Sequence, residues 1–154
     1  MSEFNRAEWA VRRSRPEDLP PVLELLEGAG LPVAGVEEWF EHFVVAEAGG
    51  RIVGVAGLEV YGTDGLLRSV AVASEWRGRG LGRALTEAVL EAAAREGVSA
   101  VYLLTETAES FFRGYAFRRI AREEASEAVK ASVEFREVCP ASSAVMVRSL
   151  AAAS

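Results

Sequence analysis

The chain has 154 residues, of which 50% are hydrophobic and 26% charged, and this length and composition are typical of one globular domain. Its single cysteine and single histidine exclude an intrachain disulfide and a structural zinc site, which needs about four Cys or His ligands. The apolar runs are shorter than the roughly 20 residues of a membrane span, and residues 1–6 lack the apolar segment of a signal peptide. We therefore expect a cytoplasmic protein with one domain over residues 1–154, without a membrane partner and without a bound metal.

The charge balance narrows the function classes. The formal net charge is −6, which disfavours a nucleic-acid partner because nucleic-acid-binding domains usually carry a basic surface. Lys130 is the only lysine and has no glycine beside it, which excludes the lysine-bearing phosphate loop of nucleotide hydrolases. We attribute the preference for arginine and alanine to a GC-rich bacterial genome.

Hydrophobic periodicity and turn residues predict a strand, two helices and three further strands in the first half of the chain. In order, these elements cover residues 9–13, 16–28, 36–43, 44–48, 51–60 and 66–73. The Gly49-Gly50 pair and residues 62–65 are typical of tight turns, so the last three strands should form an antiparallel meander.

The second half begins with a loop rich in glycine and arginine, which becomes a helix at Leu81 and ends at Gly97. A strand, a short helix and two strands are expected after it, over residues 98–104, 108–114, 117–121 and 143–150. The apolar run at 98–104 is typical of a strand buried on both faces, and it should pair in parallel with the strand before the helix. The pattern over 126–139 is ambiguous. The fold class is therefore α+β, with a mixed sheet that combines an antiparallel meander and a β-α-β crossover.

The segment from 70 to 83 suits the binding of a phosphate or pyrophosphate. A strand leads through three alternate glycines to a helix N-terminus, where unpaired N–H groups and the helix dipole favour an anion. Residues 66–83 hold four arginines against one glutamate, within an acidic protein. Arg83 occupies the third glycine position of a dinucleotide-binding fingerprint, which excludes that motif. The alternative interpretation is a plain glycine-rich connection between strand and helix.

Six residues of this loop resemble a family motif. The run Arg77-Gly78-Arg79-Gly80-Leu81-Gly82 is similar to the R/Q-x-x-G-x-G/A motif of the GCN5-related N-acetyltransferase (GNAT) superfamily. Residues 70–72 and Phe117 resemble that family's acyl-CoA-binding strand and its terminal Gly-Phe pair, and in element order the resemblance covers residues 11–150. A narrower resemblance, to small arsenic-resistance (ArsN-type) and amino-acid N-acetyltransferases, rests on residues 65–72, 102–105, 111–112, 134–136 and 139–144.

The resemblance implies a GNAT-like sheet with helices on both faces and a direct transfer of acetyl from acetyl-CoA to the amine of a small molecule, in a ternary complex. Pantetheine would pair with the backbone of residues 70–72, and backbone amides of residues 77–82 would hold the pyrophosphate. The cofactor-binding residues so implied are Val70, Ala71, Val72, Arg77, Gly78, Arg79, Gly80, Leu81, Gly82, Arg83, Thr105 and Phe112. The interpretation is compatible with a homodimer.

Three positions depart from the family pattern. Thr105 occupies a position where family members often have an asparagine that contacts pantetheine, and Ala116 occupies the terminal glycine position. Phe112 occupies the position of a tyrosine that often protonates the CoA thiolate, so the general acid is unassigned. Phe112 also favours an alternative function, a non-catalytic acyl-CoA-binding sensor with the same fold.

Glu59, Arg68 and Tyr102 are the candidate catalytic residues. Glu59 could deprotonate the acceptor ammonium, directly or through water, or it is an exposed charge at a strand end. Arg68 lies inside an apolar strand and needs a partner, either a carboxylate of the acceptor or Glu59 in an internal ion pair. Tyr102 and Tyr115 are candidate acids, with core packing as the alternative.

Other polar side chains also have two interpretations. Thr105 and Glu106 end the apolar strand, where functional sites commonly form, or they cap the following helix. Cys139 is either a nucleophile or soft-metal ligand or, more simply, a small buried hydrophobic residue. His42 is expected at the surface.

Overall fold

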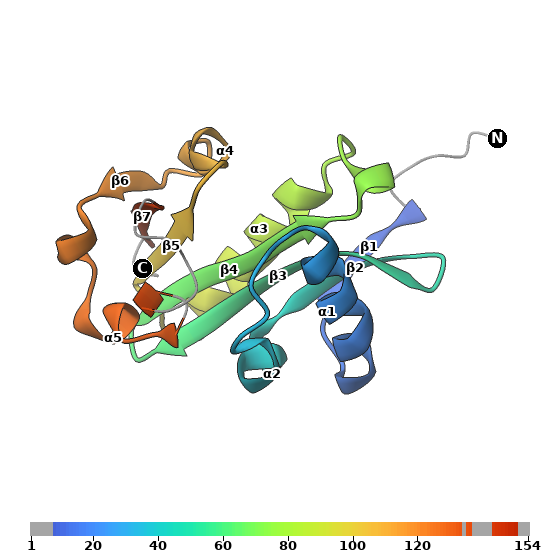
Figure 1. Cartoon of the computed structure of the whole chain (residues 1–154), viewed down its shortest axis with the longest axis horizontal. Coiled ribbons are helices and arrows are strands. Elements are labelled where there is room, and N and C mark those ends of the chain that lie inside the picture. The colour runs from blue at the N-terminus through green and yellow to red at the C-terminus, as the bar shows by residue number, and fades with distance from the viewer. Residues whose placement is uncertain (1–7, 134, 137–142, 151–154) are drawn as a thin grey trace. The chain divides into compact units, whose positions relative to one another are not determined.

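The computed structural model describes residues 8–133, 135–136 and 143–150. Their strands pair in the order β1-β2-β3-β4-β5-β7-β6 (Figure 1). The strands are β1 (Ala10–Arg13), β2 (Val44–Ala48), β3 (Arg51–Tyr61), β4 (Asp64–Val72), β5 (Ala100–Thr105), β6 (Arg118–Ile120) and β7 (Ala144–Ser149). The α-helices are α1 (Leu19–Gly28), α2 (Val36–Trp39), α3 (Leu81–Arg95), α4 (Glu109–Arg113) and α5 (Glu127–Lys130), and 3-10 turns form η2 (Pro16–Asp18), η3 (Phe40–His42), η4 (Ser74–Trp76) and η5 (Arg122–Glu124).

The pairing of the strands confirms the predicted mixed sheet. β1 pairs with β2, and β2 with β3, in antiparallel ladders. β4 pairs in parallel with β5, and α3 connects these two strands along the chain. β7 then pairs antiparallel with both β5 and β6. The segment β4-α3-β5 is therefore the predicted β-α-β crossover.

The chain divides into two compact units, one of residues 1–57 and 69–89 and the other of residues 58–68 and 90–154. In the first unit, α1 and α2 cover one face of the strands and α3 lies on the other face (Figure 1). Buried side chains of the strands and of the segments α1 to η3 form one apolar cluster, made of Val22, Leu26, Val36, Phe40, Phe43, Val45, Val55 and Ala71.

Two glycines of β3 make room for side chains that pack on the two faces of this strand. A Cβ at Gly57 would lie 2.3 Å from the ring of Phe43, which belongs to the apolar cluster. A Cβ at Gly54 would lie 2.9 Å from Leu85 of α3. The strand can therefore be packed closely on both faces only because these two positions carry no side chain.

The second unit has its own apolar cluster, formed by Leu66, Ala125, Val129, Phe135 and Val145. Tyr61 and Tyr102 pack against it. The guanidinium of Arg122 lies 4.6 Å from the centre of the Phe135 ring and donates to the Phe135 carbonyl at 3.2 Å. These contacts fix Phe135 in the cluster.

Three details differ from the sequence-based expectations. Residues 36–43 form α2 and η3 instead of one helix, and residues 127–130 of the ambiguous segment form α5. The prediction that the strand after α3 is buried on both faces was wrong: Val101 and Leu103 are buried, whereas Tyr102 and Leu104 are half-buried. Tyr102 and Leu104 pack at the margin of the second cluster, so one face of this strand is fully buried and the other face is only partly buried.

Glu134 and Cys139 lie outside the described residues. Among the described helices, none has the length and apolarity that a membrane crossing requires.

Candidate functional site

The glycine loop between β4 and α3 has an open backbone. Gly78 and Gly80 have φ angles of +79° and +89°, a region that L side chains rarely adopt. A Cβ at either position would meet no other heavy atom within 4 Å, so a ligand can approach the loop closely. The 15-residue helix α3 begins at Leu81, and the N–H groups of its first turn have no partner within the helix. The loop therefore fits the pyrophosphate of a coenzyme.

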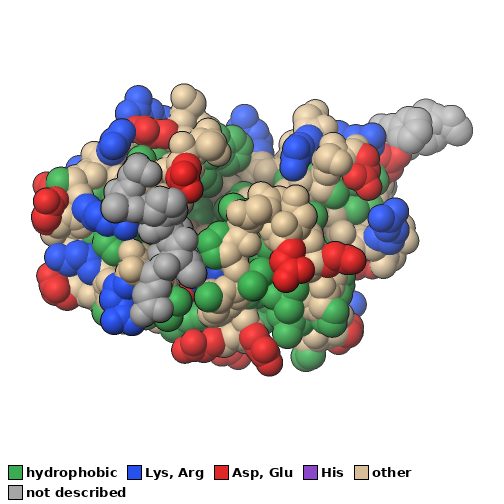
Figure 2. All heavy atoms as spheres, viewed as in Figure 1, with side chains coloured by type: hydrophobic (Ala, Val, Ile, Leu, Met, Phe, Trp, Pro, Cys, Tyr) green, Lys and Arg blue, Asp and Glu red, His purple; other side chains and the backbone are tan. Residues whose placement is uncertain are grey.

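Arginine side chains surround this loop, but not all those expected. Arg77, Arg79 and Arg83 are exposed, and Figure 2 shows basic side chains at the upper right of the viewed face, where Figure 1 draws the loop. Arg79 stacks on Trp76, with its guanidinium 4.5 Å from the ring centre. Arg68 is only 3% exposed, so the prediction that it belongs to the same basic surface was wrong. Arg68 is buried because its charge is paired inside the second unit.

The partner of Arg68 is Glu59. Arg68 Nη1 donates to Glu59 Oε2 at 2.7 Å, and the two side chains are 0% and 2% exposed. The interpretation of Glu59 as an exposed strand-end charge was therefore wrong, and the internal ion pair is present. The physical reason is that an arginine in an apolar strand needs a counter-ion, which the neighbouring strand β3 supplies.

A third residue completes this cluster. The hydroxyl of Tyr61 donates to Glu59 Oε1, so both carboxylate oxygens have a donor. Sequence reasoning did not select Tyr61. The available signal was its spacing, because residues 59 and 61 of one strand point to the same face of the sheet.

The segment predicted to pair with pantetheine, residues 70–72, is separated from Arg68 on β4 by Ser69 alone. Ser69 has a φ of +61°, one of two positive values among the described non-glycine residues. Ala71 is buried in the apolar cluster of the first unit, while Val70 and Val72 are half-buried. A non-glycine residue in this conformation costs about 1–3 kcal/mol, and such strain is concentrated at functional sites.

The structure places the remaining candidates of the second unit mainly in packing roles. The hydroxyl of Thr105 accepts the Ala108 N–H at 2.9 Å in the turn before α4. The N-cap residue of α4 is Ala108 and no side chain caps this helix, so the helix-cap interpretation of Thr105 was wrong: its hydroxyl holds the preceding turn. Tyr102 packs against the second cluster. Phe112 is 7% exposed, with its ring centre 5.0 Å from that of Phe111 and 5.8 Å from that of Phe117. Phe112 is therefore a core residue of the unit.

Ala116, at the position of the family's terminal glycine, has a φ of +68°. This backbone conformation explains why a glycine is favoured there, since glycine alone adopts it without a Cβ penalty. The neighbouring Phe117 is 3% exposed, so the turn is fixed by a buried ring.

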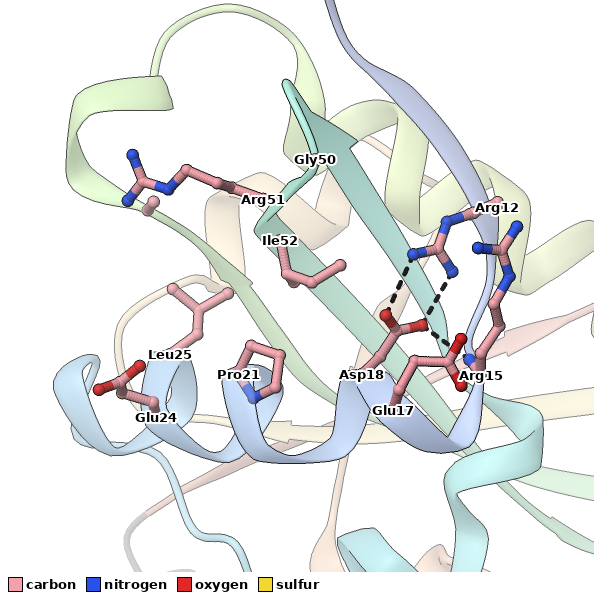
Figure 3. Close-up of a pocket in the computed structure, with 11 residues that line it drawn as sticks. Arg12, Arg15, Glu17, Asp18, Pro21, Glu24, Leu25, Gly50, Arg51 and Ile52 are labelled. Atoms are coloured by element: carbon pink, nitrogen blue, oxygen red, sulfur yellow. Dashed lines mark hydrogen bonds and ion pairs between the residues drawn. The ribbon is translucent and has the colours of Figure 1, made fainter.

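A separate pocket of about 620 Å³ lies in the first unit between α1 and the β2–β3 hairpin (Figure 3). Arg12 donates to the two carboxylate oxygens of Asp18 at 2.8 and 3.1 Å and to Glu47 at 2.7 Å. The hydrogen bond from Arg12 lowers the pKa of the Asp18 carboxyl, and the Arg15 N–H lowers it further. These groups tie β1 to η2 and β2, and the pocket contains none of the candidate catalytic residues.

Comparisons with known proteins identify the family. Residues 39–119 match the acetyltransferase (GNAT) domain. An uncharacterised N-acetyltransferase of Chlorobaculum tepidum is 32% identical over 125 residues, 76% of this chain and 80% of that protein. The amino-acid acetyltransferase of Mycobacterium tuberculosis is 31% identical over 113 residues, 67% of this chain and 65% of its own length.

Two solved structures show the same fold. The N-acetylglutamate synthase of Neisseria gonorrhoeae, complexed with coenzyme A and N-acetyl-glutamate, has a TM-score of 0.80 at 21% identity, over 93% of this chain and 35% of that one. A Mycobacterium tuberculosis protein in complex with CoA and NLQ has a TM-score of 0.79 at 24% identity, over 92% and 99% of the two chains. The narrower arsenic-resistance resemblance stays a prediction. The domain match over more than half of the residues and the 32% identical relative show that the chain belongs to the GNAT acetyltransferases, whose acetyl donor is acetyl-CoA.

Proposed function

We propose that this GNAT acetyltransferase moves the acetyl group of acetyl-CoA to the amine of a small, amino-acid-like acceptor that carries a carboxylate. The observation that carries the proposal is the buried Arg68–Glu59 pair on β3 and β4. Two similar proteins support it by name: one is an amino-acid acetyltransferase, and another was solved with CoA and N-acetyl-glutamate.

The pair offers the two charges that an amino acid needs. The guanidinium of Arg68 matches a carboxylate in geometry and charge, and Glu59 would attract the ammonium group. Glu59 would also remove the proton of that ammonium, directly or through a water molecule, and so produce the nucleophilic amine. Because both side chains are almost fully buried, an acceptor has to displace the groups that cover them. An acceptor bound there is largely shielded from water, which strengthens each charge interaction.

The acetyl donor would be held by residues on β4 and in the loop after it. Acetyl-CoA supplies, when bound, an activated acetyl group and a thiolate leaving group. Backbone groups of residues 70–72 would pair with its pantetheine arm, and a backbone N–H near Val70 would polarise the thioester carbonyl. The amides of residues 77–82, with Arg83 beside them, would hold its pyrophosphate. Thr105 and Phe112 are connected with the cofactor only through the resemblance to the family, and Tyr102 is the proposed proton donor to the thiolate.

Thiol release from acetyl-CoA, measured with a panel of amino acids and their decarboxylated analogues, tests the acceptor class. Turnover of amino acids at least tenfold faster than of the matching analogues is expected, with the acetylated product identified by its mass. Faster turnover of the carboxylate-free amines would overturn the acceptor assignment. Firm CoA binding without turnover of any amine would instead favour the acyl-CoA sensor, the alternative suggested by Phe112.

A further inference from the structure

Tyr61, Glu59 and Arg68 form a buried polar cluster that we call the Tyr61–Glu59–Arg68 triad. Tyr61 donates to one oxygen of the Glu59 carboxylate, and Arg68 donates to the other at 2.7 Å. Of the three residues, only Tyr61 is half-buried; the other two are 2% and 3% exposed. Tyr61 thus supplies the second donor to a carboxylate that has almost no access to water.

The hydroxyl of Tyr61 is fixed by the packing of its own ring. The ring lies against the apolar cluster of the second unit, to which Val129 and Phe135 belong. Phe135 is held in turn by Arg122, which stacks on its ring and binds its carbonyl. An aromatic side chain with two rotatable bonds, packed in this way, places its hydroxyl in one position.

This geometry determines which way the carboxylate of Glu59 faces. A carboxylate held by one donor can rotate about its last side-chain bond, whereas donors on both oxygens fix its plane. Because Arg68 binds the second oxygen, fixing that plane also fixes the position of the guanidinium. The order of dependence therefore runs from the Tyr61 ring to Glu59 and from Glu59 to Arg68.

We propose that Tyr61 is a positioning residue of the acetyl transfer, which acts through Glu59 to hold Arg68 ready for the acceptor. This inference rests on the proposed function, since it assigns the acceptor to the Glu59–Arg68 pair. Tyr61 contacts neither substrate; its hydroxyl orients the two side chains that do. Loss of the hydroxyl should affect the acceptor and leave the acetyl donor unaffected.

The variant Tyr61→Phe removes the hydroxyl and keeps the ring in its apolar cluster. We expect kcat/KM for the acceptor to fall about tenfold, mainly through KM, because a hydrogen bond to a charged group is lost. The KM for acetyl-CoA should not change. Val22→Ala is the control: it trims the apolar cluster of the first unit, to which Tyr61 does not belong, so it should lower the melting temperature and leave the ratio of the two KM values unchanged.

A double-mutant cycle with Glu59→Gln separates positioning from general damage. If Tyr61 acts through Glu59, the double variant should be no slower with the acceptor than Glu59→Gln alone. Losses that multiply in the double variant would overturn the positioning role, as would a Tyr61→Phe protein that is unfolded or that loses affinity for both substrates alike. The cycle uses whichever amine the wild-type enzyme acetylates fastest. An amine without a carboxylate in that place would refute the proposed acceptor class but still test the cycle, and absence of any turnover would overturn both proposals.

Discussion

The Arg68–Glu59 pair gives a prediction that separates a role in stability from a role in binding. Arg68→Leu roughly keeps the side-chain volume and removes the counter-ion of a carboxylate that is 2% exposed. Breaking one partner of a buried ion pair costs about 3–5 kcal/mol, because the other charge is left buried and unpaired. For a chain of 154 residues, each kcal/mol corresponds to a shift in melting temperature of about 2–4 °C. We therefore expect Arg68→Leu to melt about 6–20 °C below the wild type.

The double variant Arg68→Leu/Glu59→Leu should recover most of that loss. Replacing a whole buried pair by apolar side chains of similar volume is often neutral for stability, since no charge is left without a partner. Its acceptor kinetics should not recover, because the guanidinium that binds the carboxylate and the carboxylate that would deprotonate the ammonium are both absent. We expect kcat/KM for a carboxylate-bearing acceptor to stay at least about 10- to 100-fold below the wild type, the loss that corresponds to one charge-assisted hydrogen bond of about 1.5–3 kcal/mol, with the loss of the base added to it.

Thermal unfolding and steady-state kinetics of the three proteins check this reasoning. The KM for acetyl-CoA should be nearly the same in the wild type and the double variant, which shows that the donor site is intact. Recovery of both stability and acceptor kinetics in the double variant would refute the binding role, and the pair would then be purely structural. A single variant as stable as the wild type would refute the electrostatic reasoning itself, and with it the conclusion that Glu59 depends on Arg68.

Three further predictions concern other parts of the molecule. Gly80→Asp places a carboxylate beside the expected pyrophosphate and should bind CoA more than tenfold more weakly than Gly80→Ala in calorimetry. Gly80→Ala is the control because it introduces the same backbone strain, at a φ of +89°, without the charge. Equal affinities of the two variants would exclude the loop as the phosphate site. Asp18 has a lowered pKa, so its contribution to the unfolding free energy is present above the ordinary Asp pKa of about 3.9 and is lost as pH falls through the lower folded value. The difference in unfolding free energy between wild type and Asp18→Asn should therefore be largest near neutral pH and shrink below about pH 4. A difference that does not depend on pH would contradict the ion pair. Gly57→Ala forces a Cβ to within 2.3 Å of the Phe43 ring and should lower the unfolding free energy by about 1–3 kcal/mol in denaturant unfolding. Gly28→Ala is the control: no heavy atom lies within 4 Å of its Cβ, so it should be neutral or slightly stabilising. A neutral Gly57→Ala would show that the Phe43 ring moves freely.

The parts of the fold that could be predicted from sequence are those set by local patterns. The Gly49-Gly50 turn, the glycine loop and the start of α3 at Leu81 were correct because turn residues and helical periodicity act over a few neighbours. The covering of β5 was not predictable, because an apolar run does not show whether one or both faces of its strand are fully packed. The one-turn helix α5 is capped by Ser126, whose hydroxyl accepts the Val129 N–H, but four residues are too few for hydrophobic periodicity to indicate a helix.

The candidate site shows the same division. The glycine loop could be predicted from sequence because its backbone conformation depends on consecutive residues, of which Gly78 and Gly80 have positive φ values. The burial of Glu59 could not be read from its place near a strand end, because burial depends on what the neighbouring strand and the loops place around it. Tyr61 could have been found from its i, i+2 spacing to Glu59, but that spacing has no chemical meaning until Arg68 is known to share the carboxylate.

Two residues that are not glycine hold a strained backbone conformation in the described part of the chain. Among the described non-glycine residues, only Ser69 and Ala116 have positive φ values, +61° and +68°. Ser69 directly precedes the backbone that is proposed to polarise the thioester, and Ala116 directly precedes the buried ring of Phe117. Each conformation costs free energy that a glycine would save, and so each persists only because neighbouring contacts impose it. Ala116 itself is exposed, and the turn is held by hydrogen bonds from Ala116 N–H to the Arg113 carbonyl and from Phe117 N–H to the Phe112 carbonyl, so Ala116→Gly should retain the fold. Before Ser69, the neighbouring Arg68 is held by its buried ion pair with Glu59.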